Sequence, residues 1–118
     1  MSRTVVIVDD NERFRTWACD LLAREGYAVI GDAGAGEDGL RLIDALRPDV
    51  LVLDVQLPDM SGFEVARRLS RGAATPAVVL ISARDRDDFG TAVLHSGAQA
   101  FIGKSDLSGT SLRAVLEG

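Results

Sequence analysis

Short apolar runs alternate with longer segments of helical periodicity along the whole chain. Apolar runs at residues 5–8, 27–30, 50–53, 77–81 and 100–102 predict five strands. Between and after them, apolar residues at helical spacing predict five helices, over roughly residues 14–22, 36–46, 62–71, 86–96 and 107–116. This strict alternation is typical of β-α-β units and a parallel sheet.

Each predicted helix has an apolar stripe and a stop signal. Gly26 is the expected C-terminal cap of the first helix, Pro48 ends the second, and Gly97 ends the fourth. The stripes assign buried positions to Phe14, Trp17, Ala18, Leu21 and Leu22 in the first helix, Leu42, Ile43 and Leu46 in the second, and Val65, Ala66 and Leu69 in the third.

The strand at residues 50–53 is apolar on both alternating faces, which predicts a central strand covered by helices on both sides. The fold class is therefore α/β, a doubly wound five-stranded parallel sheet with helices on both faces. The natural strand order is the flavodoxin-like 2-1-3-4-5. Ligands of such sheets bind beyond the carboxyl ends of the strands, here where strands 1 and 3 lie side by side.

Composition narrows the class of protein. With 118 residues the chain predicts one domain, residues 1–118. The net charge of −5 argues against direct nucleic-acid binding. The single cysteine, Cys19, excludes a disulfide scaffold and suits the cytoplasm, and no apolar run is long enough to predict a membrane span.

Charged and polar residues stand at the predicted strand ends. Strand 1 ends in Asp9 and Asp10, strand 3 in Asp54, strand 4 in Ser82, and strand 5 leads into Lys104. Two carboxylates about 4 Å apart repel by roughly 4 kcal/mol at an effective dielectric near 20, so three need compensation. Lys104 supplies some, and either Mg²⁺, which prefers oxygen ligands, or protonation of one acid could supply the rest.

This set of residues fits phosphoryl transfer, with Asp54 as the nucleophile. Simpler roles exist for the others: Asp10 could cap the first helix, Ser82 could close a turn, Lys104 could be a surface lysine, and Phe101 could pack in the core. A purely structural role is harder to find for Asp54, because an acid that ends a fully apolar strand is seldom buried without a partner.

Four motifs, each at a predicted strand end, together resemble the receiver domain of bacterial two-component response regulators, with its CheY-like fold. The resemblance covers essentially the whole chain and rests on Val8-Asp9-Asp10, on the stretch from Leu53-Asp54 through Pro58-Asp59-Met60-Ser61-Gly62, on Ser82-Ala83, and on Gly97-Ala98 through Phe101 to Lys104.

The resemblance implies a role for each site residue. Asp54 would accept a phosphoryl group from a sensor histidine kinase or a small phosphodonor. Mg²⁺, or Mn²⁺ in its place, would bind Asp10, Asp54 and the backbone carbonyl of Gln56, with Asp9 holding it through water. Lys104 would contact the phosphoryl group, and Ser82 and Phe101 would be the switch hydroxyl and the switch aromatic residue.

The same resemblance assigns Gln56 and Arg84 to positions that tune the lifetime of the phosphoryl group. The chain departs from many receivers at Ser105, where they carry proline. The stretch around Lys104-Ser105 is similar to receivers joined to helix-turn-helix DNA-binding domains, so the expected partners are such a C-terminal domain or a separate effector. A homodimer formed on activation is a further expectation.

The predicted function is a phosphorylation-controlled switch rather than a turnover enzyme, and three alternatives stand beside it. An aspartyl phosphatase would need an acid at the position of Gln56. A flavodoxin-like electron carrier would need a phosphate-binding loop where the chain has acidic residues after strand 1. The third alternative is a receiver-like binding module that is never phosphorylated.

Overall fold

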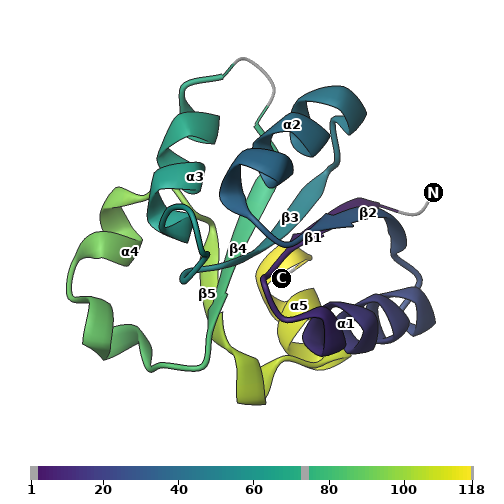
Figure 1. The fold of residues 1–118 in the computed structure, drawn as a ribbon. Helices are drawn as coiled ribbons and strands as arrows, with labels where there is room; N and C mark the ends of the chain where they lie inside the picture. The colour runs from purple at the N-terminus through teal and green to yellow at the C-terminus, as the bar shows by residue number, and fades with distance from the viewer. Residues whose placement is uncertain (1–2, 73–74, 118) are drawn as a thin grey trace.

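The computed structural model describes residues 3–72 and 75–117, and its five parallel strands form one sheet of order β2-β1-β3-β4-β5 (Figure 1). This is the predicted order. The predicted domain of 1–118 also includes residues 1, 2, 73, 74 and 118, which lie outside the described residues. The strands are β1 (Thr4–Val8), β2 (Ala28–Ala33), β3 (Val50–Asp54), β4 (Ala77–Ser82) and β5 (Ala100–Gly103).

Helices cover both faces of the sheet, as predicted (Figure 1). Helices α1 and α5 pack on one face, and α2, α3 and α4 on the other. None of the helices in the described part of the chain is long and apolar enough to cross a membrane. Their bounds are α1 (Glu12–Arg24), α2 (Gly36–Leu46), α3 (Gly62–Ser70), α4 (Ala92–His95) and α5 (Gly109–Leu116), with 3-10 turns η1 (Arg86–Phe89) and η2 (Lys104–Asp106).

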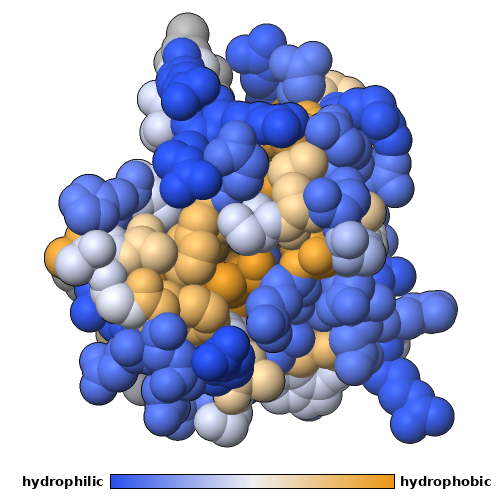
Figure 2. Space-filling view, turned by 60° about the vertical axis from the view of Figure 1, so that its left-hand side comes forward, coloured by the Kyte–Doolittle hydropathy of each residue, from blue (hydrophilic) through white to orange (hydrophobic). Residues whose placement is uncertain are grey.

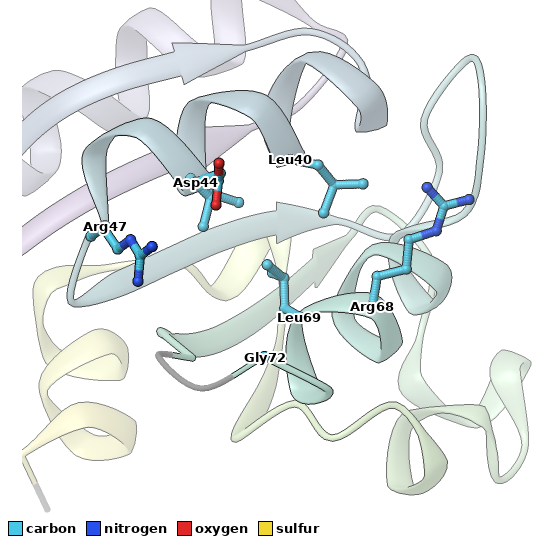
Figure 3. A pocket seen from close by; sticks show the side chains of 7 residues that line it. Leu40, Asp44, Arg47, Arg68, Leu69 and Gly72 are labelled. Carbon is cyan, nitrogen blue, oxygen red and sulfur yellow. The ribbon is translucent and has the colours of Figure 1, made fainter.

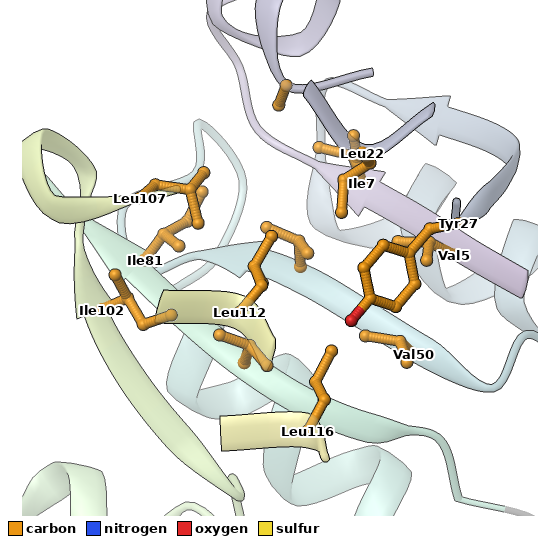
Figure 4. Packing of buried hydrophobic residues seen from close by; sticks show 13 residues of the cluster. Val5, Ile7, Leu22, Tyr27, Val50, Ile81, Ile102, Leu107, Leu112 and Leu116 are labelled. Carbon is orange, nitrogen blue, oxygen red and sulfur yellow. The ribbon is translucent and has the colours of Figure 1, made fainter. Parts of the chain in front are cut away.

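The core forms two layers because successive strand residues point to opposite faces of the sheet. In β3, Val50 and Val52 pack toward α1 and α5, whereas Leu51 and Leu53 pack toward α2 and α3. Figure 4 shows the first layer, where Leu112 of α5 lies over the strands. The prediction that β3 is buried on both faces is confirmed, since all of its residues are buried.

Three expectations about individual elements are wrong in detail. Strand β2 covers residues 28–33 rather than 27–30, because its pairing with β1 continues to the partner residues Val8 and Ala33. Trp17 and Leu46, assigned to buried stripes, are 44% and 41% exposed. Each lies at the margin of its apolar stripe, where the buried face of the helix meets solvent. The expected cap at Gly26 is confirmed by its left-handed φ of 91°.

The single helix predicted over residues 86–96 is also wrong. The segment consists of the 3-10 turn η1 and the four-residue helix α4, separated by Gly90 with φ of 58°. Glycine adopts this backbone conformation at little cost, so the chain turns there instead of continuing one helix. Leu94 of α4 is left 70% exposed.

Candidate functional site

Three carboxylates converge at the carboxyl edge of the sheet. Strands β1 and β3 are neighbours in which Val8 pairs with Leu53, so the residues that follow, Asp9 and Asp54, meet at the same edge. Asp10 completes the group, and one oxygen from each of the three carboxylates lies within 4.8 Å of the others. Asp9 and Asp54 are buried and Asp10 is exposed, which leaves one side of the cluster open to solvent.

Lys104 compensates part of this negative charge. Its Nζ lies 2.7 Å from Oδ2 of Asp9 and donates a hydrogen bond of 3.4 Å to Oδ2 of Asp54. Burial alone would lower the pKa of Lys104, but attraction to the two carboxylates outweighs it and raises the pKa above the ordinary 10.5. Lys104 is therefore a charged member of the site and not a surface lysine.

Asp54 carries the strongest electrostatic conflict. Burial, followed by repulsion from Asp9, raises the pKa of Asp54 from 3.8 to about 6, although the Gln56 amide and Lys104 act in the opposite direction. Each pKa unit corresponds to about 1.4 kcal/mol. Relative to an unperturbed carboxyl group, the folded protein therefore disfavours the ionised form of Asp54 by roughly 3 kcal/mol. A ligand that adds positive charge beside Asp54 relieves this conflict.

The donor set fits a hard divalent cation. All three side chains offer carboxylate oxygens, the ligand type that Mg²⁺ prefers. Oδ2 of Asp9 is buried, and the group that faces it among the described residues is Nζ of Lys104 at 2.7 Å. The cap of α1 is Asn11, whose side chain accepts the Phe14 N–H at 3.0 Å. The capping alternative for Asp10 is therefore wrong, and its carboxylate is left for a ligand.

The loop after β3 is fixed by its own backbone. The amide of Gln56 donates to Oδ1 of Asp54 at 3.2 Å, and Gln56 forms an antiparallel bridge with Ser61. Gly62 is required at its position, because a Cβ there would lie 2.2 Å from the carbonyl oxygen of Asp54. This close return of the chain holds Gln56 beside the carboxylates.

Ser82 and Arg84 both belong to the turn that follows β4. Ser82 is buried, and its Oγ accepts the Arg84 N–H at 3.0 Å, which is the turn-closing role expected of a serine there. The Arg84 guanidinium lies 5.6 Å from the ring centroid of Phe89 and 3.7 Å from Asp88. The Arg84 side chain therefore packs along η1.

Phe101 joins the sheet to the segment that contains α4. Its ring is half-buried and lies 5.9 Å, centroid to centroid, from Phe89, which is in turn 5.4 Å from Phe63 of α3. The core-packing alternative for Phe101 is thus consistent with the structure. The same contacts connect β5 to η1, the element on which Arg84 packs.

Two supporting residues were not singled out from the sequence. Arg15 of α1 donates to the carbonyl oxygen of Asp9 at 2.6 Å and to Oδ2 of Asp32 at 2.9 Å, which ties the ends of β1 and β2 together. Asp59 accepts the backbone N–H groups of Gly36 and Glu37 at 2.7 and 3.0 Å. One signal could have revealed Asp59: Ala35, just before α2, has no side-chain oxygen to cap the helix.

A hollow of about 330 Å³ lies between the C-terminal halves of α2 and α3 (Figure 3). Arg47 and Arg68 stand on opposite sides of it, over Leu40 and Leu69. Asp44 also lines this hollow, but Asp9, Asp10 and Asp54 do not, and the C-terminal ends of these helices lie near the amino ends of the strands. The candidate chemistry is therefore confined to the opposite edge of the sheet.

Comparison with known proteins agrees with this geometry. The family model of the response regulator receiver domain matches residues 5–116. The chain is 38% identical over 101 residues to the response regulator GacA of Pseudomonas aeruginosa, covering 85% of this chain and 47% of GacA. It is 40% identical over 101 residues to the transcriptional regulatory protein AfsQ1 of Streptomyces coelicolor, covering 86% and 44%.

Among solved structures, the signal receiver domain of NarL from Mycobacterium tuberculosis superposes with a TM-score of 0.88 at 35% identity, covering 98% of this chain and 94% of that one. The α/β fold of this chain is thus shared with a receiver domain of known structure. The chain belongs to the response regulator receiver domain family of two-component systems. It spans about half the length of the curated relatives it matches.

Proposed function

We propose that this chain is a phosphoacceptor switch in which Asp54 receives a phosphoryl group. The observation that supports this most directly is the placement of Asp54 beside Lys104 and two further carboxylates at an edge open to solvent. A carboxylate oxygen of Asp54 attacks phosphorus and forms a new O–P bond, while the P–N bond of a kinase phosphohistidine breaks and the kinase histidine leaves, taking up a proton. With a small donor such as acetyl phosphate, a P–O bond breaks and acetate leaves.

The residues that would hold Mg²⁺, or Mn²⁺, are Asp10, Asp54 and the carbonyl of Gln56, with Asp9 acting through water. When bound, the cation supplies positive charge that offsets the charge on the transferring oxygens. Lys104, at the end of β5, adds a second positive charge. Its ion pairs with Asp9 and Asp54 already orient its ammonium group toward the Asp54 carboxylate. The raised pKa of Asp54 means that a cation also favours the ionised, nucleophilic form.

Phosphorylation adds about −1.5 to −2 charges next to Ser82 and Lys104. Ser82 would exchange the Arg84 amide for a phosphoryl oxygen, and Phe101 would turn into the space left behind. Because Phe101, Phe89 and Phe63 are packed in series, that movement would shift η1 and α4. Converting a 1:99 equilibrium to 99:1 needs about 5.5 kcal/mol, which a few charge-assisted hydrogen bonds can supply.

The remaining parts of the proposal concern lifetime and context. Gln56 and Arg84 would tune how long the phosphoryl group persists, by restricting the hydrolytic water. The donor would be a sensor histidine kinase, and the whole of residues 1–118 would be one receiver domain working in the cytoplasm as a switch and not as a turnover enzyme. Its output would be a DNA-binding domain or a separate effector, with a homodimer forming on activation. The DNA-binding output is supported by the relatives named as transcriptional regulators.

Intact mass spectrometry after incubation with acetyl phosphate and Mg²⁺ tests the proposal. We expect one labile phosphoryl adduct on the native protein and none on the Asp54→Asn variant or on a sample treated with a chelator. An Asp32→Asn variant is the matched control, because this carboxylate also lies at a strand end but outside the cluster. No adduct on the native protein would contradict the proposal and favour a binding module that is never phosphorylated.

A further inference from the structure

The ring of Phe14 lies beneath the ammonium group of Lys104. Nζ of Lys104 is 4.5 Å from the centroid of the Phe14 ring, within the roughly 6 Å range of a cation–π contact. The same Nζ faces Oδ2 of Asp9 at 2.7 Å and Oδ2 of Asp54 at 3.4 Å. Only 20% of the Lys104 side chain is exposed, so protein atoms, these three groups among them, surround most of it.

The position of the ring is set by α1 and does not depend on Lys104. Asn11 caps the helix by accepting the Phe14 N–H at 3.0 Å, which fixes where the first turn begins. The Phe14 ring packs against the core layer beneath α1 and lies 5.7 Å, centroid to centroid, from the Trp17 ring. A rigid aromatic face is thus present at this point before any ligand arrives.

Lysine needs such a support more than most residues do. Its ammonium is carried on a flexible four-carbon stem and accepts many arrangements around a carboxylate. Both Asp9 and Asp54 carry carboxylates that attract the ammonium group, and Asp9 is the nearer of the two. An aromatic face restricts the ammonium to positions from which it still reaches Asp54.

We propose that Phe14 is a positioning residue for Lys104, holding its ammonium at the acceptor carboxylate. This inference rests on the proposed function: the same placement of the Lys104 ammonium aligns its positive charge with the incoming phosphoryl group. Phe14 touches neither the phosphodonor nor the cation, and it acts only through Lys104. Replacing the ring by an aliphatic side chain of similar size removes the cation–π contact and keeps most of the packing.

Two measurements on Phe14→Leu, Phe14→Tyr and Trp17→Leu test the proposal. The first is the NMR shift of the Lys104 ε-methylene protons in the metal-free, unphosphorylated protein, which a ring beneath the ammonium moves upfield. The second is the rate of Asp54 phosphorylation by acetyl phosphate with Mg²⁺. We expect Phe14→Leu to lose the upfield shift and to react about three- to tenfold more slowly. Phe14→Tyr restores both values, and Trp17→Leu, which removes only the neighbouring ring, changes neither.

Each outcome decides the question. An upfield shift that persists in Phe14→Leu overturns the proposal, as does a lost shift with an unchanged phosphorylation rate. Urea unfolding of every variant gives its stability. A rate loss caused by a destabilised fold would also appear in Trp17→Leu if that variant is destabilised as much as Phe14→Leu. If the native protein takes up no phosphoryl group, the proposed function fails, while the proton shift still shows whether Phe14 places Lys104.

Discussion

Replacing Asp54 with asparagine should stabilise the metal-free protein at neutral pH. The pKa of Asp54 is raised to about 6 in the folded state, against 3.8 for an unperturbed carboxyl group. An acid with a raised folded-state pKa lowers stability above that pKa and has no effect below the unfolded value. The difference of about two pH units corresponds to about 3 kcal/mol at pH 7.5. Asparagine mimics the neutral acid and still accepts the Gln56 N–H.

Urea unfolding in the presence of a chelator measures this effect. With a slope of about 1–3 kcal/mol per molar urea, the unfolding midpoint of Asp54→Asn should lie about 1–3 M above that of the native protein at pH 7.5. The gap should fall to about half at pH 5 and vanish below pH 3.8. Asp32→Asn, at an exposed carboxylate that is paired with Arg15, should not be more stable than the native protein.

Added Mg²⁺ should narrow the gap between the two proteins. Binding at a hundredfold excess over the dissociation constant stabilises the native protein by about 2.7 kcal/mol, and a variant that lacks one carboxylate ligand gains less. Equal midpoints of the metal-free proteins at pH 7.5 would refute the electrostatic reasoning about Asp54. A gap that persists undiminished at pH 4 would refute it as well, because the carboxyl group is then neutral in the folded state and the expected gap is only about 0.6 kcal/mol.

Three further predictions concern the elements that support the site. Gly62→Ala should destabilise the protein by at least about 1–3 kcal/mol in urea unfolding, because the added Cβ would lie 2.2 Å from the carbonyl oxygen of Asp54. Asp59→Ala should speed hydrogen exchange at the first two amides of α2, which lose their acceptor, while the amides of β3 stay protected. Leu112→Ala should lower the free energy of unfolding by about 2–5 kcal/mol, since this side chain of α5 is fully buried against the sheet.

The central sheet could be predicted from the sequence because apolar runs mark its strands and segments of helical periodicity separate them. The alternation of strands with helices predicted a doubly wound parallel sheet, for which 2-1-3-4-5 is a natural strand order, and that order brings Asp9 next to Asp54. Residues at strand ends are thus placed by topology, which explains why the carboxylate cluster and Lys104 were foreseen. The chemistry of the cluster needed only residue types and this shared edge.

Side chains that act across elements could not be predicted in the same way. The bridge from Arg15 to the Asp9 carbonyl depends on the direction of one side chain relative to a neighbouring strand end. The contact between Asp59 and the N-terminus of α2 joins segments more than 20 residues apart. Periodicity reports which face of an element is buried and says nothing about which long polar side chain reaches a particular backbone group.

The segment after β4 is the one place where the predicted element itself is wrong, and it is also the segment that the proposed switch would move. Its break at Gly90 leaves two short helical pieces, and Leu94 of α4 is largely exposed. Figure 2 turns forward the side of the molecule on which Figure 1 shows α3 and α4, and an apolar patch lies there between polar margins. Such segments open at low free energy. The amides of α4 should therefore exchange at least about a hundredfold faster than those of β3, a difference of about 2.7 kcal/mol. Equal protection would mean that α4 is as rigid as the sheet, and a switch acting through Phe101 would then have no movable element.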